Sequence, residues 1–110
     1  MTGQDLYQSL NYELKFQKAL IDEMREDGHR KANAESDYYI AKYNTAMELH
    51  KQGMAVTLIN TIIKGHPNVA QKLKEFRVSE TIYDADKSAQ IACQNRLRNL
   101  EKQIEWERRG

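Results

Sequence analysis

Hydrophobic residues recur at steps of three or four along most of the chain, which is the spacing of amphipathic helices. Gly28, Gly53, Gly65 and Pro67 divide this pattern into four segments. The residue types throughout suit helices, and one proline and five glycines are too few turn residues for most all-β designs. We therefore predict an all-α fold, and the length of 110 residues predicts one helical domain covering 1–110.

The first two segments, at about 4–27 and 29–52, have similar lengths. Leucines at positions 6, 10 and 14 form one apolar face of the first segment, whereas the second is apolar on two sides. Gly28 either bends one long helix or separates two helices. A reversal at this glycine gives an antiparallel helical hairpin, which is the arrangement we expect.

The other two segments are predicted to be a short connector helix and a long C-terminal helix. Thr57 is a candidate N-cap and Gly65 a candidate C′ residue for the connector. Pro67 fits the first turn of the last helix, which meets no further glycine or proline before Gly110 and is interrupted only if it breaks near Val78. The apolar stripe of that helix is predicted to comprise Val69, Leu73, Phe76, Ile82, Ala85, Ala89, Cys93, Leu97, Leu100 and Ile104.

The end of this stripe has heptad spacing, since Cys93, Leu97, Leu100 and Ile104 follow one another at steps of four, three and four. The stripe is either a seam between copies or a core face covered by the same chain. Two hairpin helices of about 24 residues reach roughly 36 Å, whereas an unbroken last helix reaches about 60 Å. We therefore predict a homo-oligomer, with a dimer favoured, in which these four residues form the seam and Trp106 lies at its edge.

The segment from Leu49 to Ile59 suggests an alternative, because it is similar to the centre of a helix-turn-helix motif with Gly53 in the turn. A DNA-binding surface would then consist of Thr57, Asn60, Thr61 and Lys64. The absence of arginine from this short helix argues against it. The competing interpretation is a short amphipathic connector that closes the end of the bundle.

Composition excludes several other classes of protein. The 17 basic and 16 acidic residues leave a net charge of +1, too small for a nucleic-acid coat or a polybasic membrane anchor. One cysteine excludes an internal disulfide and a cysteine-based zinc site. The chain has no apolar run long enough to span a membrane and no apolar block near its start, so we expect a cytoplasmic protein.

The sequence also lacks a recognisable catalytic or cofactor-binding pattern, so we predict no enzyme activity, cofactor or metal. Glu26 and His29 have the Glu-x-x-His spacing of di-iron proteins, but the chain contains no second pair. Cys93 lies on an apolar stripe, where a cysteine is usually a small core residue.

Three stretches resemble small all-helical proteins encoded in phages and prophages of Gram-positive bacteria: 53–59, the Lys64-Gly65 pair followed by Val69, and 96–107. The resemblance implies an accessory protein made in a bacterial cytoplasm during phage growth, and it brings no functional residues with it. Our hypothesis is a non-enzymatic, self-associating helical module that acts by protein binding.

Overall fold

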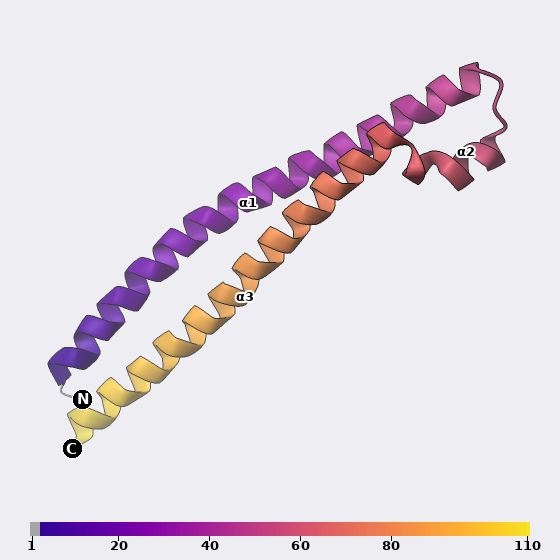
Figure 1. Ribbon diagram of the computed structural model, residues 1–110. Coiled ribbons are helices and arrows are strands. Elements are labelled where there is room, and N and C mark those ends of the chain that lie inside the picture. The colour runs from indigo at the N-terminus through magenta and orange to yellow at the C-terminus, as the bar shows by residue number, and fades with distance from the viewer. Residues whose placement is uncertain (1–2) are drawn as a thin grey trace. The chain divides into compact units, whose positions relative to one another are not determined.

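The computed structural model describes residues 3–110, and its regular elements within that range are all helical. Helix α1 spans Gly3–Lys51, α2 spans Val56–Ile62, a single 3₁₀ turn η1 spans Ile63–Gly65, and α3 spans Pro67–Arg109 (Figure 1). The all-α prediction is therefore confirmed, although the number and bounds of the helices differ from those expected.

Helix α1 passes through Gly28 without a break, so the hairpin expected between 4–27 and 29–52 does not form. A glycine inside a helix costs only about 1 kcal/mol relative to alanine, which packing of the flanking turns outweighs. A Cβ at Gly28 would lie 3.4 Å from the ring Cε2 atom of Tyr83. Gly28 is therefore a point of close approach to α3 rather than the end of a helix.

Gly53 ends α1, as the sequence predicted. Its φ of 90° lies in the left-handed region, where only glycine is free of a Cβ penalty. The Gly53 amide donates to the carbonyl of His50 at 3.0 Å, and the Met54 amide donates to that of Leu49 at 3.1 Å. This pair of hydrogen bonds is a Schellman motif, which satisfies the last carbonyls of α1 and turns the chain.

We expect alanine substitutions at these two glycines to change stability in opposite directions. Gly53→Ala should lower the free energy of unfolding by about 1 kcal/mol, because it places a Cβ on left-handed backbone. Gly28→Ala should raise it by up to about 1 kcal/mol, because the helix gains alanine's propensity. Urea unfolding followed by circular dichroism measures both values, and an equal loss in the two variants would contradict this account.

The connector starts earlier than predicted, and Thr57 is not its N-cap. The N-cap is Ala55, which has extended backbone and no side-chain capping bond, whereas Thr57 lies inside α2. Packing determines these bounds, since Ile59 and Ile63 are one turn apart and each is only 3% exposed. Gly65 closes the 3₁₀ turn without adopting a positive φ, and Pro67 begins α3 as predicted.

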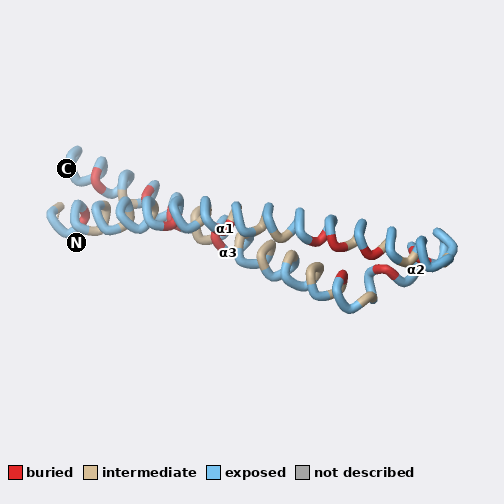
Figure 2. Tube along the Cα trace, turned by 90° about the horizontal axis from the view of Figure 1, so that it is seen from above, coloured by how far each residue is buried: buried red, intermediate tan, exposed pale blue. Residues whose placement is uncertain are grey.

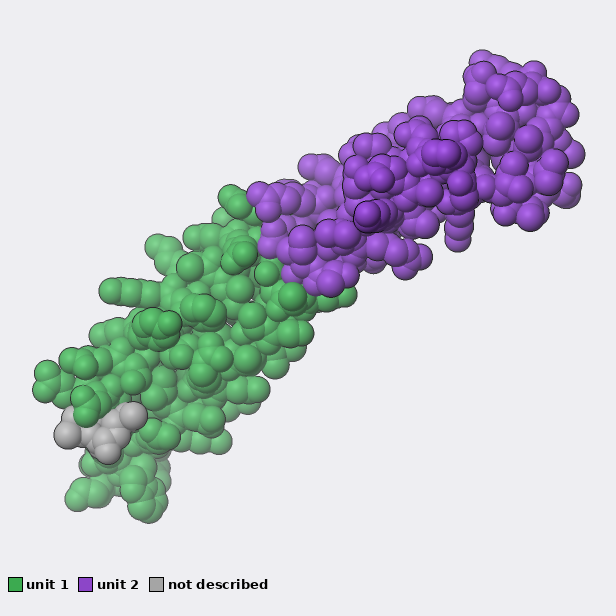
Figure 3. Space-filling model, viewed as in Figure 1, with its two compact units in different colours: residues 1–26, 84–110 green, residues 27–83 purple. Residues whose placement is uncertain are grey.

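The chain divides into two compact units (Figure 3). Unit 1 contains Met1–Glu26 and Asp84–Gly110. Within unit 1, α1 and α3 run in opposite directions, because Glu13 contacts Arg96 while Tyr7 contacts Arg108. The core side chains of unit 1 are Leu6, Leu20, Cys93, Leu97 and Ile104, each no more than 9% exposed.

Unit 2 contains Asp27–Tyr83, including α2 and η1. Its central cluster consists of Tyr38, Ile59, Ile63 and Val69, with Leu49, Leu73 and Phe76 partly buried against it. The rings of Tyr38 and Phe76 stack with centroids 6.2 Å apart. The buried isoleucines of α2 and η1 thus contribute directly to the core of this unit.

The buried face of α3 follows a different course from the predicted stripe. The helix passes Val78 without a break, and burial recurs in short stretches separated by exposed positions (Figure 2). Ile82 and Ala85 are exposed, whereas Tyr83 is half-buried and Asp86 is buried. The prediction for Ile82 and Ala85 is wrong, because the buried face of the helix passes through Tyr83 and Asp86, one position after each of them.

Candidate functional site

Most of the predicted seam is covered within the chain. Cys93, Leu97 and Ile104 are 0%, 7% and 9% exposed, and unit 1 sets their helix against α1. Leu100 is half-buried, whereas Trp106 is 78% exposed. The comparison of helix lengths that led to an uncovered stripe is wrong, because it assumed that α1 ends at Gly28.

Cys93 has a specific polar neighbour that the sequence did not reveal. Its Sγ atom lies 3.6 Å from the carboxylate Oε2 of Glu13 and 3.7 Å from the main-chain carbonyl of that residue. Glu13 also accepts a 2.8 Å hydrogen bond from Nε of Arg96. Burial raises the pKa of the Cys93 thiol, and Glu13 raises it further. The thiol is therefore protonated and unsuited to nucleophilic attack.

We expect Cys93 to react at least about tenfold more slowly with a chromogenic disulfide reagent in the folded chain than in urea. Absorbance after addition of the reagent measures the rate, and equal rates in both states would contradict a buried thiol.

The raised pKa of the Cys93 thiol also makes the stability of the chain depend on pH. Above the ordinary thiol pKa the unfolded chain loses the thiol proton before the folded chain does, so the free energy of unfolding should fall as the pH rises.

The four candidate DNA-binding side chains all lie on the surface of unit 2. Thr57, Asn60 and Thr61 are exposed on α2, and Lys64 is exposed on η1. The Thr61 hydroxyl already donates to the carbonyl of Thr57 at 2.9 Å. The exposed side of this segment is also partly apolar, since it includes Val56, Leu58 and Ile62.

A groove of about 500 Å³ lies on the surface of unit 2. Its apolar residues are Ala70, Leu73, Val78 and Ile82, and Thr81 lies among them. Val78 is 51% exposed and Ile82 is 47% exposed. The remaining lining residues are Lys64, Lys74 and Arg77, so the groove combines apolar side chains with three cations and has no acidic lining residue.

The groove follows from a second periodicity in α3. Positions 70, 74, 78 and 82 follow one another at steps of four, and positions 73, 77 and 81 do the same alongside them. Because residues four apart share a helix face, these seven positions form one strip. The apolar spacing of α3 predicts a single core stripe that includes Leu73 and Ile82, and it does not reveal this surface.

Trp106 lies over a shallow hollow in unit 1. The hollow has a volume of about 420 Å³ and is lined by Leu6, Lys102, Gln103, Trp106 and Glu107. With 78% of its surface exposed, the indole is available to a partner without being held in a pocket. This side chain is the part of the predicted seam that stays accessible.

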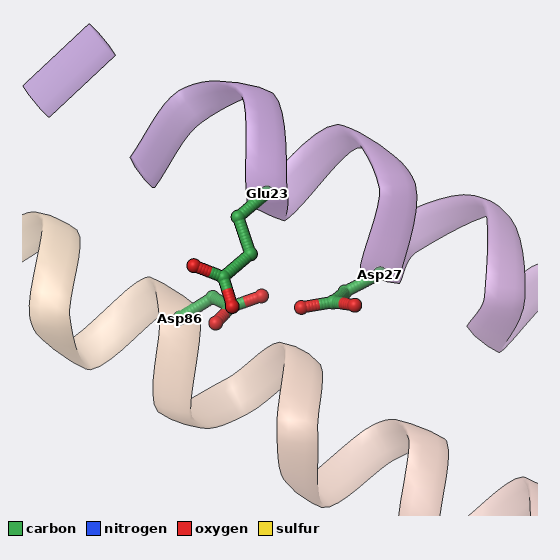
Figure 4. A group of neighbouring side chains, drawn as sticks. All are labelled: Glu23, Asp27 and Asp86. Carbon is green, nitrogen blue, oxygen red and sulfur yellow. The ribbon is translucent and has the colours of Figure 1, made fainter. Parts of the chain in front are cut away.

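Acidic residues meet in unit 1, where Glu23 on α1 faces Asp86 on α3 (Figure 4). A carboxylate oxygen of each lies within 4.8 Å of the other. Asp27, one turn further along α1 and the first residue of unit 2, is 4% exposed and accepts a 3.0 Å hydrogen bond from Arg30. Carboxylates can bind hard cations, but exposed acidic groups such as Glu23 are common without a metal. The sequence pattern did not identify Asp27 and Asp86 as buried acids.

No protein-family model, curated protein or solved structure matches the chain. Among residues 3–110, no helix combines the length and the apolar character that crossing a membrane requires.

Proposed function

We propose that this chain is a non-enzymatic helical interaction module that acts by associating with further copies of itself. The groove of unit 2 supports the proposal best, because two of its apolar side chains, Val78 and Ile82, stay about half exposed in a single chain although they line one concave surface. A concave apolar surface with polar groups at its edge is typical of a contact site.

The energetic reason is the exposed aliphatic surface. Full burial of a valine or isoleucine side chain contributes about 1.5–3 kcal/mol, so covering the exposed half of Val78 or Ile82 contributes roughly 1 kcal/mol each. The charged side chains of Lys64, Lys74 and Arg77 line the same groove. The association surface proposed here replaces the predicted seam, of which only Trp106 remains largely exposed.

This proposal is compatible with the accessory role that the phage resemblance implies. A self-associating helical module needs no catalytic group, because its effect comes from bringing copies or bound partners together. In this view the buried stripe of unit 1 stabilises the fold, and the groove of unit 2 makes the contact between copies.

Sedimentation equilibrium of the full chain, from micromolar to near-millimolar concentration, tests the proposal. We expect the average mass to rise above the 12.9 kDa of one chain as the concentration increases. A mass of one chain over the whole range would contradict self-association.

DNA binding through α2 and η1 is the second candidate, favoured by the shared exposure of Thr57, Asn60, Thr61 and Lys64. We expect any such binding to weaken steeply with salt and to decrease in Lys64→Glu, because phosphate contacts depend on cations. A gel shift with random-sequence duplex DNA measures both effects. No shift at low salt would remove this candidate.

A further inference from the structure

We infer that the groove of unit 2 binds a single-chain aliphatic carboxylate, a fatty-acid anion, which competes there with a second copy of the chain. Only the competition rests on the proposed self-association, because the binding itself involves one chain. Two properties of the groove support the inference, namely its dimensions and the cations that line it.

The groove has the dimensions of one extended hydrocarbon chain. At about 1.5 Å per residue, its wall between positions 70 and 82 of α3 extends about 18 Å. A volume of about 500 Å³ spread over this length corresponds to a mean width of about 5 Å. Carbon atoms in contact lie about 4 Å apart, so one methylene chain fills this width. A twelve-carbon chain is about 14 Å long, since each C–C bond of about 1.5 Å advances it by about 1.25 Å, and it therefore fits the length of the groove.

The wall of the groove offers aliphatic surface to such a chain. Val78 and Ile82 are 51% and 47% exposed, and Leu73 is half-buried beside them. The Thr81 hydroxyl donates to the main-chain carbonyl of Arg77 at 3.0 Å, so its polar atom is already engaged within α3. Each methylene group that is buried against this wall should strengthen binding about fourfold.

The cations of the groove supply a charge that is complementary to a carboxylate. Lys64 comes from η1, whereas Lys74 and Arg77 come from α3, so positive charge reaches the groove from two elements. Within residues 3–110 these three side chains form no ion pair or hydrogen bond, whereas the nearby Lys72 pairs with Glu75 at 3.4 Å. A guanidinium can bind both oxygens of a carboxylate. An anion with an aliphatic chain therefore satisfies both the cations and the wall.

A fatty-acid anion fits the groove better than larger anions do. A lipid with two acyl chains is wider than a groove that holds one chain, and a nucleic-acid backbone would leave Val78 and Ile82 without an apolar partner. A helix of a second copy, which is about 10–12 Å across with its side chains, would cover the groove and place only side chains in it. Since the carboxylate and the second copy both use Val78 and Ile82, binding of one excludes the other.

Isothermal titration calorimetry of the full chain with laurate, a twelve-carbon carboxylate, tests the binding. The titration is run below the concentration at which laurate forms micelles, and with the chain dilute enough to have the mass of one copy. We expect one laurate to bind per chain. Dodecyltrimethylammonium, which has the same chain length and the opposite charge, should bind at least about tenfold more weakly because the groove repels it. Hexanoate should bind at least about 100-fold more weakly, because it lacks six of the methylene groups.

Amide chemical shifts of the ¹⁵N-labelled chain show where laurate binds. We expect the shifts that change most on titration to belong to position 64 and to positions 70–82, which include all the lining residues of the groove. Changes centred on the hollow beside Trp106, or spread over the exposed apolar residues of both units, would contradict binding in the groove.

A pair of neutral variants separates the groove from the surface in general. Lys74→Gln with Arg77→Gln removes two cations of the groove, and Lys15→Gln with Lys18→Gln removes two cations of unit 1 at the same spacing of three. All four side chains are exposed, so folding should be retained and can be checked by circular dichroism. The groove variant should bind laurate at least about tenfold more weakly than the parent, whereas the control should bind it as the parent does.

Sedimentation equilibrium with and without laurate tests the competition. At concentrations where the parent self-associates, saturating laurate should return its mass to that of one chain, and an unchanged mass would overturn the competition. A chain that self-associates but does not bind laurate, or that binds it equally in the groove variant and the control, would overturn the inference and leave self-association standing. A chain that binds laurate in the groove but has the mass of one copy at every concentration would support the binding and contradict the proposed function.

Discussion

Replacement of Leu97 by aspartate is expected to unfold unit 1 rather than to separate an oligomer into folded monomers. Leu97 is 7% exposed and lies in a helix that packs against α1 of the same chain. An ionised carboxylate in this position would leave water for the apolar core of unit 1, and burying it would cost several kcal/mol. Since small domains are stable by about 5–15 kcal/mol, the loss would be a large fraction of the total. Thermal unfolding followed by circular dichroism measures the effect.

The matched control is Ile91→Asp, on the same helix and in the same unit. Ile91 is 59% exposed, so its carboxylate would stay hydrated, and we expect a change within about 0.5 kcal/mol. If the Leu97 variant instead kept the melting temperature and helicity of the parent while its mass fell to one chain, the stripe would be an oligomer seam after all. That result would contradict the packing of α1 over this stripe within one chain.

The second large effect is expected in the groove, where Val78→Ser with Ile82→Ser should weaken self-association about 10- to 100-fold. Each substitution removes aliphatic surface whose burial at the contact contributes roughly 1 kcal/mol, and every 1.4 kcal/mol corresponds to a tenfold change in the dissociation constant. Folding should be little affected, because both side chains are about half exposed in one chain. The dissociation constant from sedimentation equilibrium is the measurement.

Ile40→Ser with Ile91→Ser provides the comparison, since these isoleucines are 55% and 59% exposed and neither lines the groove. This pair should associate as the parent does. If both double variants lost association equally, a general loss of apolar surface would explain the result better than a specific groove.

Local signals in the sequence were sufficient where one residue determines the backbone. Gly53 ended a helix because the left-handed position of a Schellman motif requires a residue without a Cβ, and Pro67 began one because its missing N–H is not needed there. Gly28 is also a glycine, but it lies inside α1 and does not end the helix. Its role depends on Tyr83, which is 55 positions away in the chain, and no local pattern reveals such a contact.

The candidate site was harder to predict because α3 has two kinds of apolar position. Heptad spacing correctly grouped Cys93, Leu97 and Ile104, yet it could not say which helix covers them. Ile82 looked like a continuation of that stripe, since a step of three or four connects it to later members. Only the packing of Tyr83 and Asp86 shows that the buried face has turned away and that Ile82 belongs to the groove.

The most direct test of the account is a cross-link from the groove between isotopically distinct copies. A photoreactive side chain in place of Thr81, which lines the groove, would couple to whatever covers it. In an equal mixture of ¹⁵N-labelled and unlabelled chains, mass spectrometry should find cross-linked peptide pairs with one labelled and one unlabelled member. Cross-links confined to peptides of the same label would contradict contact between copies through the groove.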